Sequence, residues 1–297
     1  MAHIGFIGLG HMGLPMATAL LKAGHEVIGF DKASEPMNAL KAVGGRIASS
    51  LKAAVTNQDI VITMLQTGEQ VKSVTEGATG LFETMSAGTL YIDCSTIDVE
   101  TSVDVHESAR VKKLFMVDAP VSGGVKAAED ASLTFMVGGE VEGFKKAEPV
   151  LEAMGKQVLY MGLGGRGVAA KICNNMILGI SMVSVSEAFL LADKLGLSAK
   201  KLHESVTKSS GNCWVMDKYV PVPDVLPSVP ANDEYHPGFS SAMMLKDLKL
   251  ASDASEATGI RAGLGAFALA LYEEAGEQIQ SLDFSSIYQY IKDQTTK

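Results

Sequence analysis

The sequence predicts an α/β protein with an N-terminal doubly wound sheet of parallel strands, a long helix joining two domains, and an all-α C-terminal domain. Short β-rich runs alternate with helical patterns through about the first 160 residues. A nearly unbroken helical pattern of about 28 residues then begins at Val168, and no convincing strand follows it. A chain of 297 residues also exceeds one typical core. We therefore expect two domains, residues 1–164 and 165–297.

The N-terminal strands are expected where apolar and β-branched residues gather between turn signals. The candidates are residues 4–7, 26–30, 60–65, 90–93, 115–118 and 133–137, with 158–160 as a last one. Between the first two, Leu14, Ala17 and Leu21 recur at helical spacing, and Gly24 is placed to end that helix. This β-strand, helix, β-strand unit predicts a parallel sheet.

The C-terminal half reads as helical. The long pattern from Val168 would extend on the order of 40 Å at about 1.5 Å per residue. Lys171, Asn174, Asn175 and Glu187 interrupt it, and such groups are costly in lipid, so we interpret it as a helix buried in protein. Helical patterns follow at residues 199–208, 243–258 and 262–274, whereas the proline-rich segment 220–237 is expected to be a loop.

Composition and charge exclude several classes of function. The net charge of −9 argues against nucleic acid or an anionic membrane as the main partner, and leaves a small molecule. The cysteines Cys94, Cys173 and Cys213 are odd in number and lack metal-ligand spacing, so neither a disulfide framework nor a metal site is expected. With no secretory pattern at the N-terminus, we expect a reducing, cytoplasmic location.

A glycine-rich motif directly after the first predicted strand points to a dinucleotide. Its spacing is G-x-G-x-x-G: the first glycine permits a tight turn, the second a close approach of pyrophosphate, and the third close helix packing. Asp31 ends the second strand, where a carboxylate can bind the ribose 2′-hydroxyl and would repel a 2′-phosphate; Lys32 would partly offset that repulsion. We therefore expect a Rossmann-type domain that favours NAD over NADP. The predicted loop consists of Gly8, Leu9, Gly10, His11, Met12 and Gly13.

The long helix carries a candidate proton-transfer group. Lys171 is followed one turn later by Asn174 and Asn175, so the amine and an amide share a face. A lysine in a mostly apolar helix either pairs with an acid or has its pKa lowered by desolvation, and the second case would allow proton transfer near neutral pH. A snorkelling lysine at a helix start is the alternative, and spacing leaves both open.

A second candidate follows the strand at 115–118. The run from Asp118 to Gly124 ends in Ser122, Gly123 and Gly124, whose hydroxyl and unhindered amides could hold a carboxylate. An ordinary turn fits the same residues. Lys246 lies at the start of a predicted helix after the proline-rich loop, where a surface lysine is the default interpretation.

Four motifs in order resemble the β-hydroxyacid dehydrogenase family, and within it the 3-hydroxyisobutyrate dehydrogenases, over nearly the whole chain. They are residues 6–16 (FIGLGHMGLPM), 118–124 (DAPVSGG), 162–175 (GxxGxGxxxKxxxN) and 246–248 (KDL). Two departures stand out. Gln66 occupies a position where proline is usual, and Ala131 one where glycine is usual.

The resemblance implies a role for each matching residue. Lys171 would be the catalytic acid/base, Asn175 would orient the substrate, and Ser122, Gly123 and Gly124 would hold its carboxylate. The cofactor positions implied are Leu65, Gln66, Gln70, Thr96 and Lys246, in addition to the glycine loop and Asp31.

The implied reaction is the NAD-dependent oxidation of 3-hydroxyisobutyrate to methylmalonate semialdehyde, a step of valine catabolism. Reduction of tartronate semialdehyde, or oxidation of another small 3-hydroxy acid such as serine, remains an alternative. A non-catalytic dinucleotide-binding module is a further one. The helical domain would also support a homodimer or homotetramer.

Overall fold

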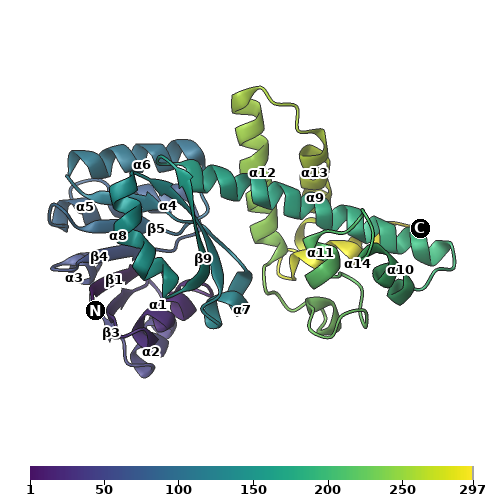
Figure 1. Ribbon diagram of the computed structural model, residues 1–297, viewed down its shortest axis with the longest axis horizontal. Helices are drawn as coiled ribbons and strands as arrows, with labels where there is room; N and C mark the ends of the chain where they lie inside the picture. The colour runs from purple at the N-terminus through teal and green to yellow at the C-terminus, as the bar shows by residue number, and fades with distance from the viewer. Residues whose placement is uncertain (296–297) are drawn as a thin grey trace. The chain divides into compact units, whose positions relative to one another are not determined.

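The computed structural model describes residues 1–295 and contains two compact units (Figure 1). Unit 1 spans Met1–Lys171, and unit 2 begins at Ile172. The division falls within helix α9 (Arg166–Lys194), and the predicted boundary at 164/165 falls just before this helix.

Unit 1 is built on a sheet that contains nine strands within the described residues. Its order is β3-β2-β1-β4-β5-β6-β8-β7, with β9 paired to β8. The strand order reverses beside β1, which lies between β2 and β4, and such a switch point creates a crevice at the carboxyl ends of the strands. The strand bounds are β1 His3–Ile7, β2 Glu26–Phe30, β3 Arg46–Ile47, β4 Ile60–Thr63, β5 Leu90–Asp93, β6 Phe115–Asp118, β7 Val121–Ser122, β8 Leu133–Gly139 and β9 Gly155–Gly162.

This architecture confirms the predicted Rossmann-type sheet, but the sheet is not parallel throughout. Following the order in the sheet, all strands from β3 across to β6 run parallel to one another, whereas β8 runs antiparallel to both β6 and β7. The chain reverses through the short helix α7 (Gly124–Glu129) at one edge instead of crossing a face of the sheet. Two-residue strands such as β3 and β7 carry too little pattern to be found in the sequence.

Helices cover both faces of this sheet (Figure 1). Helix α1 ends at Lys22, and Gly24 follows with φ +87° while its amide donates to Leu21 O, so the predicted helix stop is confirmed. The core includes Phe6, Leu20 and Phe135, all fully buried. Besides α7, the helices of this unit that precede α9 are α1 Gly13–Lys22, α2 Ser34–Ala42, α3 Leu51–Val55, α4 Gly68–Thr75, α5 Leu81–Thr84, α6 Val99–Val111 and α8 Val141–Glu152.

Unit 2 is helical in its described residues, apart from a single β-bridge between Ser240 and Asp283. The predicted loop at 220–237 is confirmed, with one short 3₁₀ helix, Pro230–Asn232. Two helices, α11 and α14, were not predicted because the first is one turn long and the second has a mixed polar pattern. The helices beyond α9 are α10 Ala199–Val206, α11 Trp214–Lys218, α12 Ser241–Thr258, α13 Gly263–Ala275 and α14 Ile287–Thr295.

Helix α9 is long and apolar enough to cross a membrane by length and composition, with a mean hydropathy of 1.6 over its most apolar window. A core helix passes the same test, and 44% of that window is buried inside the protein. The burial agrees with the interpretation of this segment as a helix packed in protein.

Candidate active site

The glycine loop lies between β1 and α1, at the carboxyl edge of the sheet. Gly8 has φ +90°, and a Cβ there would overlap the carbonyl oxygen of Met64. A Cβ on Gly13 would overlap the carbonyl oxygen of Gly8, so this glycine allows the close packing of helix against loop. Around Gly10, by contrast, a Cβ would meet no atom within 4 Å. The backbone at Gly10 is therefore open to an approaching phosphate, as a dinucleotide site requires.

Asp31 is fixed at the end of β2. Its Oδ2 accepts a hydrogen bond from the Leu9 amide at 2.7 Å, and its Oδ1 accepts one from the Ala33 amide at 2.8 Å. The carboxylate is half-buried, and the first of these bonds ties it to the glycine loop. The loop and the acid predicted to bind the ribose therefore form one connected structure, which fits an NAD(P) cofactor.

The loop after β4 lies beside the glycine loop. A Cβ on Gly8 would come within 3.1 Å of the Leu65 side chain, so these two predicted cofactor residues are neighbours. The amide of Gln66 donates to Gln70 Oε1 at 3.1 Å, and the Gln70 amide donates to Thr67 Oγ1 at the start of α4. A proline at position 66 would lack that donor. The glutamine therefore suits the local capping of α4 in this chain.

A buried polar network that the sequence analysis missed supports this edge. Asp93 accepts hydrogen bonds from Thr63 Oγ1 at 2.8 Å and from Ser95 Oγ at 2.6 Å, and Ser95 Oγ in turn accepts one from the Leu65 amide. Burial raises the pKa of the Asp93 carboxyl above its usual range, while the bonds from Ser95 and Thr63 act in the opposite direction. The network joins the ends of β4 and β5 directly before Thr96.

Ser122 ends β7, Gly123 is the N-cap of α7, and Gly124 is the first residue of that helix. Both glycines have positive φ, +132° and +72°, and a Cβ on Gly123 would clash with Ala127 at 2.5 Å. The predicted cradle therefore has a backbone that only glycine adopts easily. Ala131, the departure from the family glycine, follows α7 with φ +48°. An alanine thus occupies a left-handed position, which costs backbone strain.

Lys171 and Asn175 share one face of α9 and are buried, with 7% and 1% of their surfaces exposed. The Asn175 amide donates to Asp247 Oδ2 in α12, and Asn174 Nδ2 donates to Asn175 Oδ1 at 2.9 Å. Asp247 Oδ1 also lies 3.0 Å from Lys246 Nζ, so the two side chains form an ion pair. Asn175 is therefore held by two side chains.

Asp247 was missed as a site residue. It is buried although it follows directly after Lys246, and it lies seventy-two positions from its partner Asn175 along the chain. A signal existed, because Asp247 belongs to the same three-residue motif as Lys246, but an aspartate in the first turns of a predicted helix usually faces solvent.

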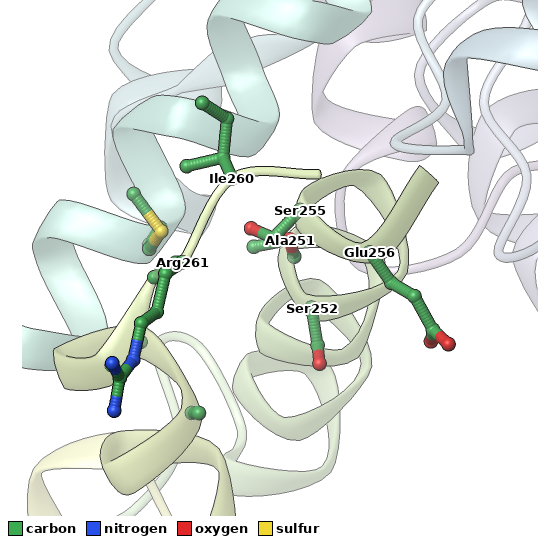
Figure 2. Close-up of a pocket in the computed structure, with 11 residues that line it drawn as sticks. Ala251, Ser252, Ser255, Glu256, Ile260 and Arg261 are labelled. Atoms are coloured by element: carbon green, nitrogen blue, oxygen red, sulfur yellow. Dashed lines mark hydrogen bonds between the residues drawn. The ribbon is translucent and has the colours of Figure 1, made fainter. Parts of the chain in front are cut away.

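A separate cavity of about 330 Å³ lies within unit 2 (Figure 2). Figure 2 shows Ser252, Ser255 and Glu256 of α12 across from Ile260 and Arg261, which precede α13. None of the predicted site residues lines this cavity.

Comparisons with known proteins agree with this architecture. A family model described as the NAD-binding domain of 6-phosphogluconate dehydrogenase matches residues 3–162. A second, described as NAD-binding of NADP-dependent 3-hydroxyisobutyrate dehydrogenase, matches residues 165–291. The fold and the glycine loop therefore define an oxidoreductase with an NAD(P)-binding domain.

Individual relatives narrow this class. A Pseudomonas aeruginosa 3-hydroxyisobutyrate dehydrogenase is 44% identical over 290 residues, 97% of each chain. An NAD-dependent L-serine dehydrogenase of the same organism is 43% identical over 272 residues, 92% of this chain and 91% of its own. The solved structure of Mycobacterium tuberculosis 3-hydroxyisobutyrate dehydrogenase with L-serine is 44% identical, with a TM-score of 0.93, and covers 98% of this chain and 99% of its own. The chain belongs to the 3-hydroxyisobutyrate dehydrogenase family and is a dehydrogenase.

Proposed function

We propose that this dehydrogenase oxidises 3-hydroxyisobutyrate to methylmalonate semialdehyde with NAD. The observation that carries the proposal is the burial of Lys171 and Asn175 one turn apart on the same face of α9. When an amine is removed from water, its charged form loses hydration, so burial favours the neutral form. A neutral amine beside a fixed amide is suited to removing a hydroxyl proton.

The glycine loop and Asp31 would hold the dinucleotide, and a bound nicotinamide would supply the acceptor for the hydride that leaves the substrate carbon. Neutral Lys171 takes the hydroxyl proton on Nζ, and returns it in the reverse reduction. Asn175, held by Asp247, orients the substrate oxygen. Ser122 and the amides of Gly123 and Gly124 bind the carboxylate, so that the carbinol carbon is positioned for transfer. Lys246 binds on the cofactor side.

The choice of NAD over NADP follows from Asp31. Its carboxylate is fixed by hydrogen bonds from the Leu9 and Ala33 amides. The 2′-phosphate of NADP would be repelled by this carboxylate, whereas the 2′-hydroxyl of NAD could donate a hydrogen bond to the carboxylate.

Steady-state kinetics of the purified protein test the proposal. The panel consists of 3-hydroxyisobutyrate, L-serine, other small 3-hydroxy acids and tartronate semialdehyde, each with the NAD and NADP couples, followed by nicotinamide absorbance. We expect the highest kcat/KM with 3-hydroxyisobutyrate and NAD. A higher kcat/KM for another substrate would overturn the assignment of 3-hydroxyisobutyrate. NAD binding without turnover of any compound in the panel would favour a non-catalytic module.

L-Serine is the second candidate substrate. A 43% identical relative is named for it, and a 44% identical relative has been solved with it. Serine shares the carboxylate and the primary hydroxyl with 3-hydroxyisobutyrate and differs by an ammonium in place of a methyl group. Selection by a pocket that adds or removes a methyl contact is worth about 1–3 kcal/mol, so the ratio of the two kcat/KM values decides between them.

We also propose that the protein is a homo-oligomer, a dimer or tetramer in the cytoplasm. Ile177 on α9 and both Leu264 and Phe267 on α13 are 61%, 71% and 57% exposed within unit 2. Large apolar side chains exposed on helices favour contact with another protein surface. Sedimentation analysis should give a mass of two or four chains, and Leu264→Asp with Phe267→Glu should shift it toward one. A single-chain mass for the unmodified protein would contradict this.

A further inference from the structure

The Asp118 carboxylate at the end of β6 is completely buried and accepts three hydrogen bonds from two other parts of unit 1. Its Oδ1 accepts from His106 Nε2 and from the Gly165 amide, each at 2.8 Å. Its Oδ2 accepts from the Val168 amide, also at 2.8 Å. Gly165 directly precedes α9 and Val168 is the third residue of the helix, so the carboxylate caps the start of this helix.

The surroundings leave room for a carboxylate in this position. A Cβ on Gly138 would lie 2.6 Å from Asp118 Oδ1, and a Cβ on Gly167 would lie 2.8 Å from Oδ2. Both neighbours therefore have to be glycine for the side chain to reach the helix amides. A negative charge at a helix N-terminus is also favourable, because the unpaired amides there carry partial positive charge.

His106 of α6 completes the arrangement from the other side. Its ring packs on Gly164, where a Cβ would come within 2.6 Å of the imidazole Cγ, and its Nε2–H donates to Asp118. The segment that leads into α9 is therefore held between an imidazole ring and a carboxylate.

We propose that Asp118 is a positioning residue for Lys171, with His106 as its partner. Lys171 lies one helical turn beyond Val168, whose amide Asp118 binds, and Ser122 lies four residues beyond Asp118 in the same chain. One buried side chain thus fixes both the first turn of the helix that carries the acid/base and the strand end that leads to the carboxylate cradle. The inference rests on the proposed function, and it assigns Asp118 no contact with substrate or cofactor.

Asp118→Asn is the first test. An asparagine has the same shape, but only one of its two terminal atoms accepts a hydrogen bond, so it cannot accept from both Gly165 and Val168. We expect kcat to fall on the order of tenfold to a hundredfold, as for a small misplacement of a catalytic group. The Kd for NAD should stay within about twofold of the unmodified value, because the glycine loop and Asp31 are untouched.

A second test compares His106→Gln with His106→Leu, and it can be carried out even if Asp118→Asn does not fold. The glutamine amide can donate to Asp118 in place of Nε2–H, whereas leucine cannot. We expect the Gln variant to keep a kcat several-fold above that of the Leu variant. Ser50→Ala is the matched control, because it removes the side-chain cap of α3 far along the chain from these motifs, and its kcat should not change.

Each outcome has a defined meaning when Lys171→Ala is measured in parallel. If Lys171→Ala abolishes turnover while folded Asp118→Asn keeps a kcat within twofold of normal, the positioning role is overturned and the proposed function stands. Equal kcat values for the Gln and Leu variants would overturn it too. If Lys171→Ala keeps turnover, the acid/base assignment fails instead.

Discussion

The backbone amide of Leu9 donates a hydrogen bond to Asp31 Oδ2 across 2.7 Å. This bond joins the glycine loop after β1 to the acid at the end of β2, so the two halves of the predicted nucleotide site are mechanically connected. A change at Asp31 should therefore affect both the choice of cofactor and the fixation of the loop.

Asp31→Asn should weaken the discrimination between NAD and NADP by roughly tenfold or more. The neutral amide no longer repels a 2′-phosphate, and a lost charge interaction of about 1.4 kcal/mol corresponds to a factor of ten. The ratio of kcat/KM values for the two cofactors measures this. Asp59→Asn, which removes the same charge beside His3 at the other end of β1, should leave the ratio unchanged. An unaltered ratio in Asp31→Asn would count against the assignment of this residue.

Lys171→Ala should lower kcat by at least about 10²–10⁴-fold, the usual contribution of a general acid/base. NAD binding, measured by the quenching of protein fluorescence or by calorimetry, should be retained. Lys194→Ala, at the exposed end of the same helix, is the control and should have a normal kcat. Turnover near the normal rate in Lys171→Ala would refute the acid/base role.

Ala131→Gly should stabilise the protein. Ser132 N donates to Ala127 O at 2.8 Å and Ala131 N to Ala128 O at 3.3 Å, a helix ending in which the left-handed residue is usually glycine. Removing the Cβ relieves about 1–2 kcal/mol of strain, offset in part by about 0.4–1 kcal/mol of unfolded-chain entropy. We expect the melting temperature to rise by about 1–4 °C. The control Ala42→Gly, at the end of α2, should lower it instead.

Two buried tyrosines should make the protein unstable at high pH. Burial raises the pKa of Tyr91 and of Tyr272 well above the usual value. Both hydroxyls therefore keep their protons in the folded protein at about pH 10, where the tyrosines of the unfolded chain ionise. Their stabilising contribution is complete below that pH and is lost as the pH rises above it, at up to about 1.4 kcal/mol per pH unit for each group.

The ultraviolet absorbance of phenolate tests this when it is followed together with far-ultraviolet circular dichroism. The absorbance steps of these two rings should coincide with unfolding. In Tyr91→Phe, the free energy of unfolding should fall less steeply with pH, because one proton fewer is released on unfolding. Ionisation of both rings in a fully folded protein would contradict the expectation.

Much of the fold could be predicted from local pattern. The strands at 26–30, 90–93 and 115–118 have the bounds expected from their apolar runs, and the long helix occupies Arg166–Lys194. The antiparallel β8 was not foreseen, because a strand's own residues specify that it pairs but not the direction of its neighbour. The one-turn helix α11 is too short to show periodicity.

The site shows the same division. The glycine loop, Asp31, Ser122–Gly124, Lys171 and Asn175 could be named from spacing and motif resemblance, and their catalytic and binding roles stay predictions. The contacts that support these residues could not be predicted. Asp118 reaches Val168 fifty positions away and Asn175 reaches Asp247 seventy-two positions away, and no local pattern records such pairs.

The sequence by itself therefore determined the class of fold, the dinucleotide motif and the order of the functional segments, because these depend on periodicity and on residue type at short spacing. Only the tertiary structure decided which buried polar groups hold those segments in place. A buried carboxylate such as Asp118 is stable only where donors from distant segments converge on it, and that convergence is a property of the packed chain.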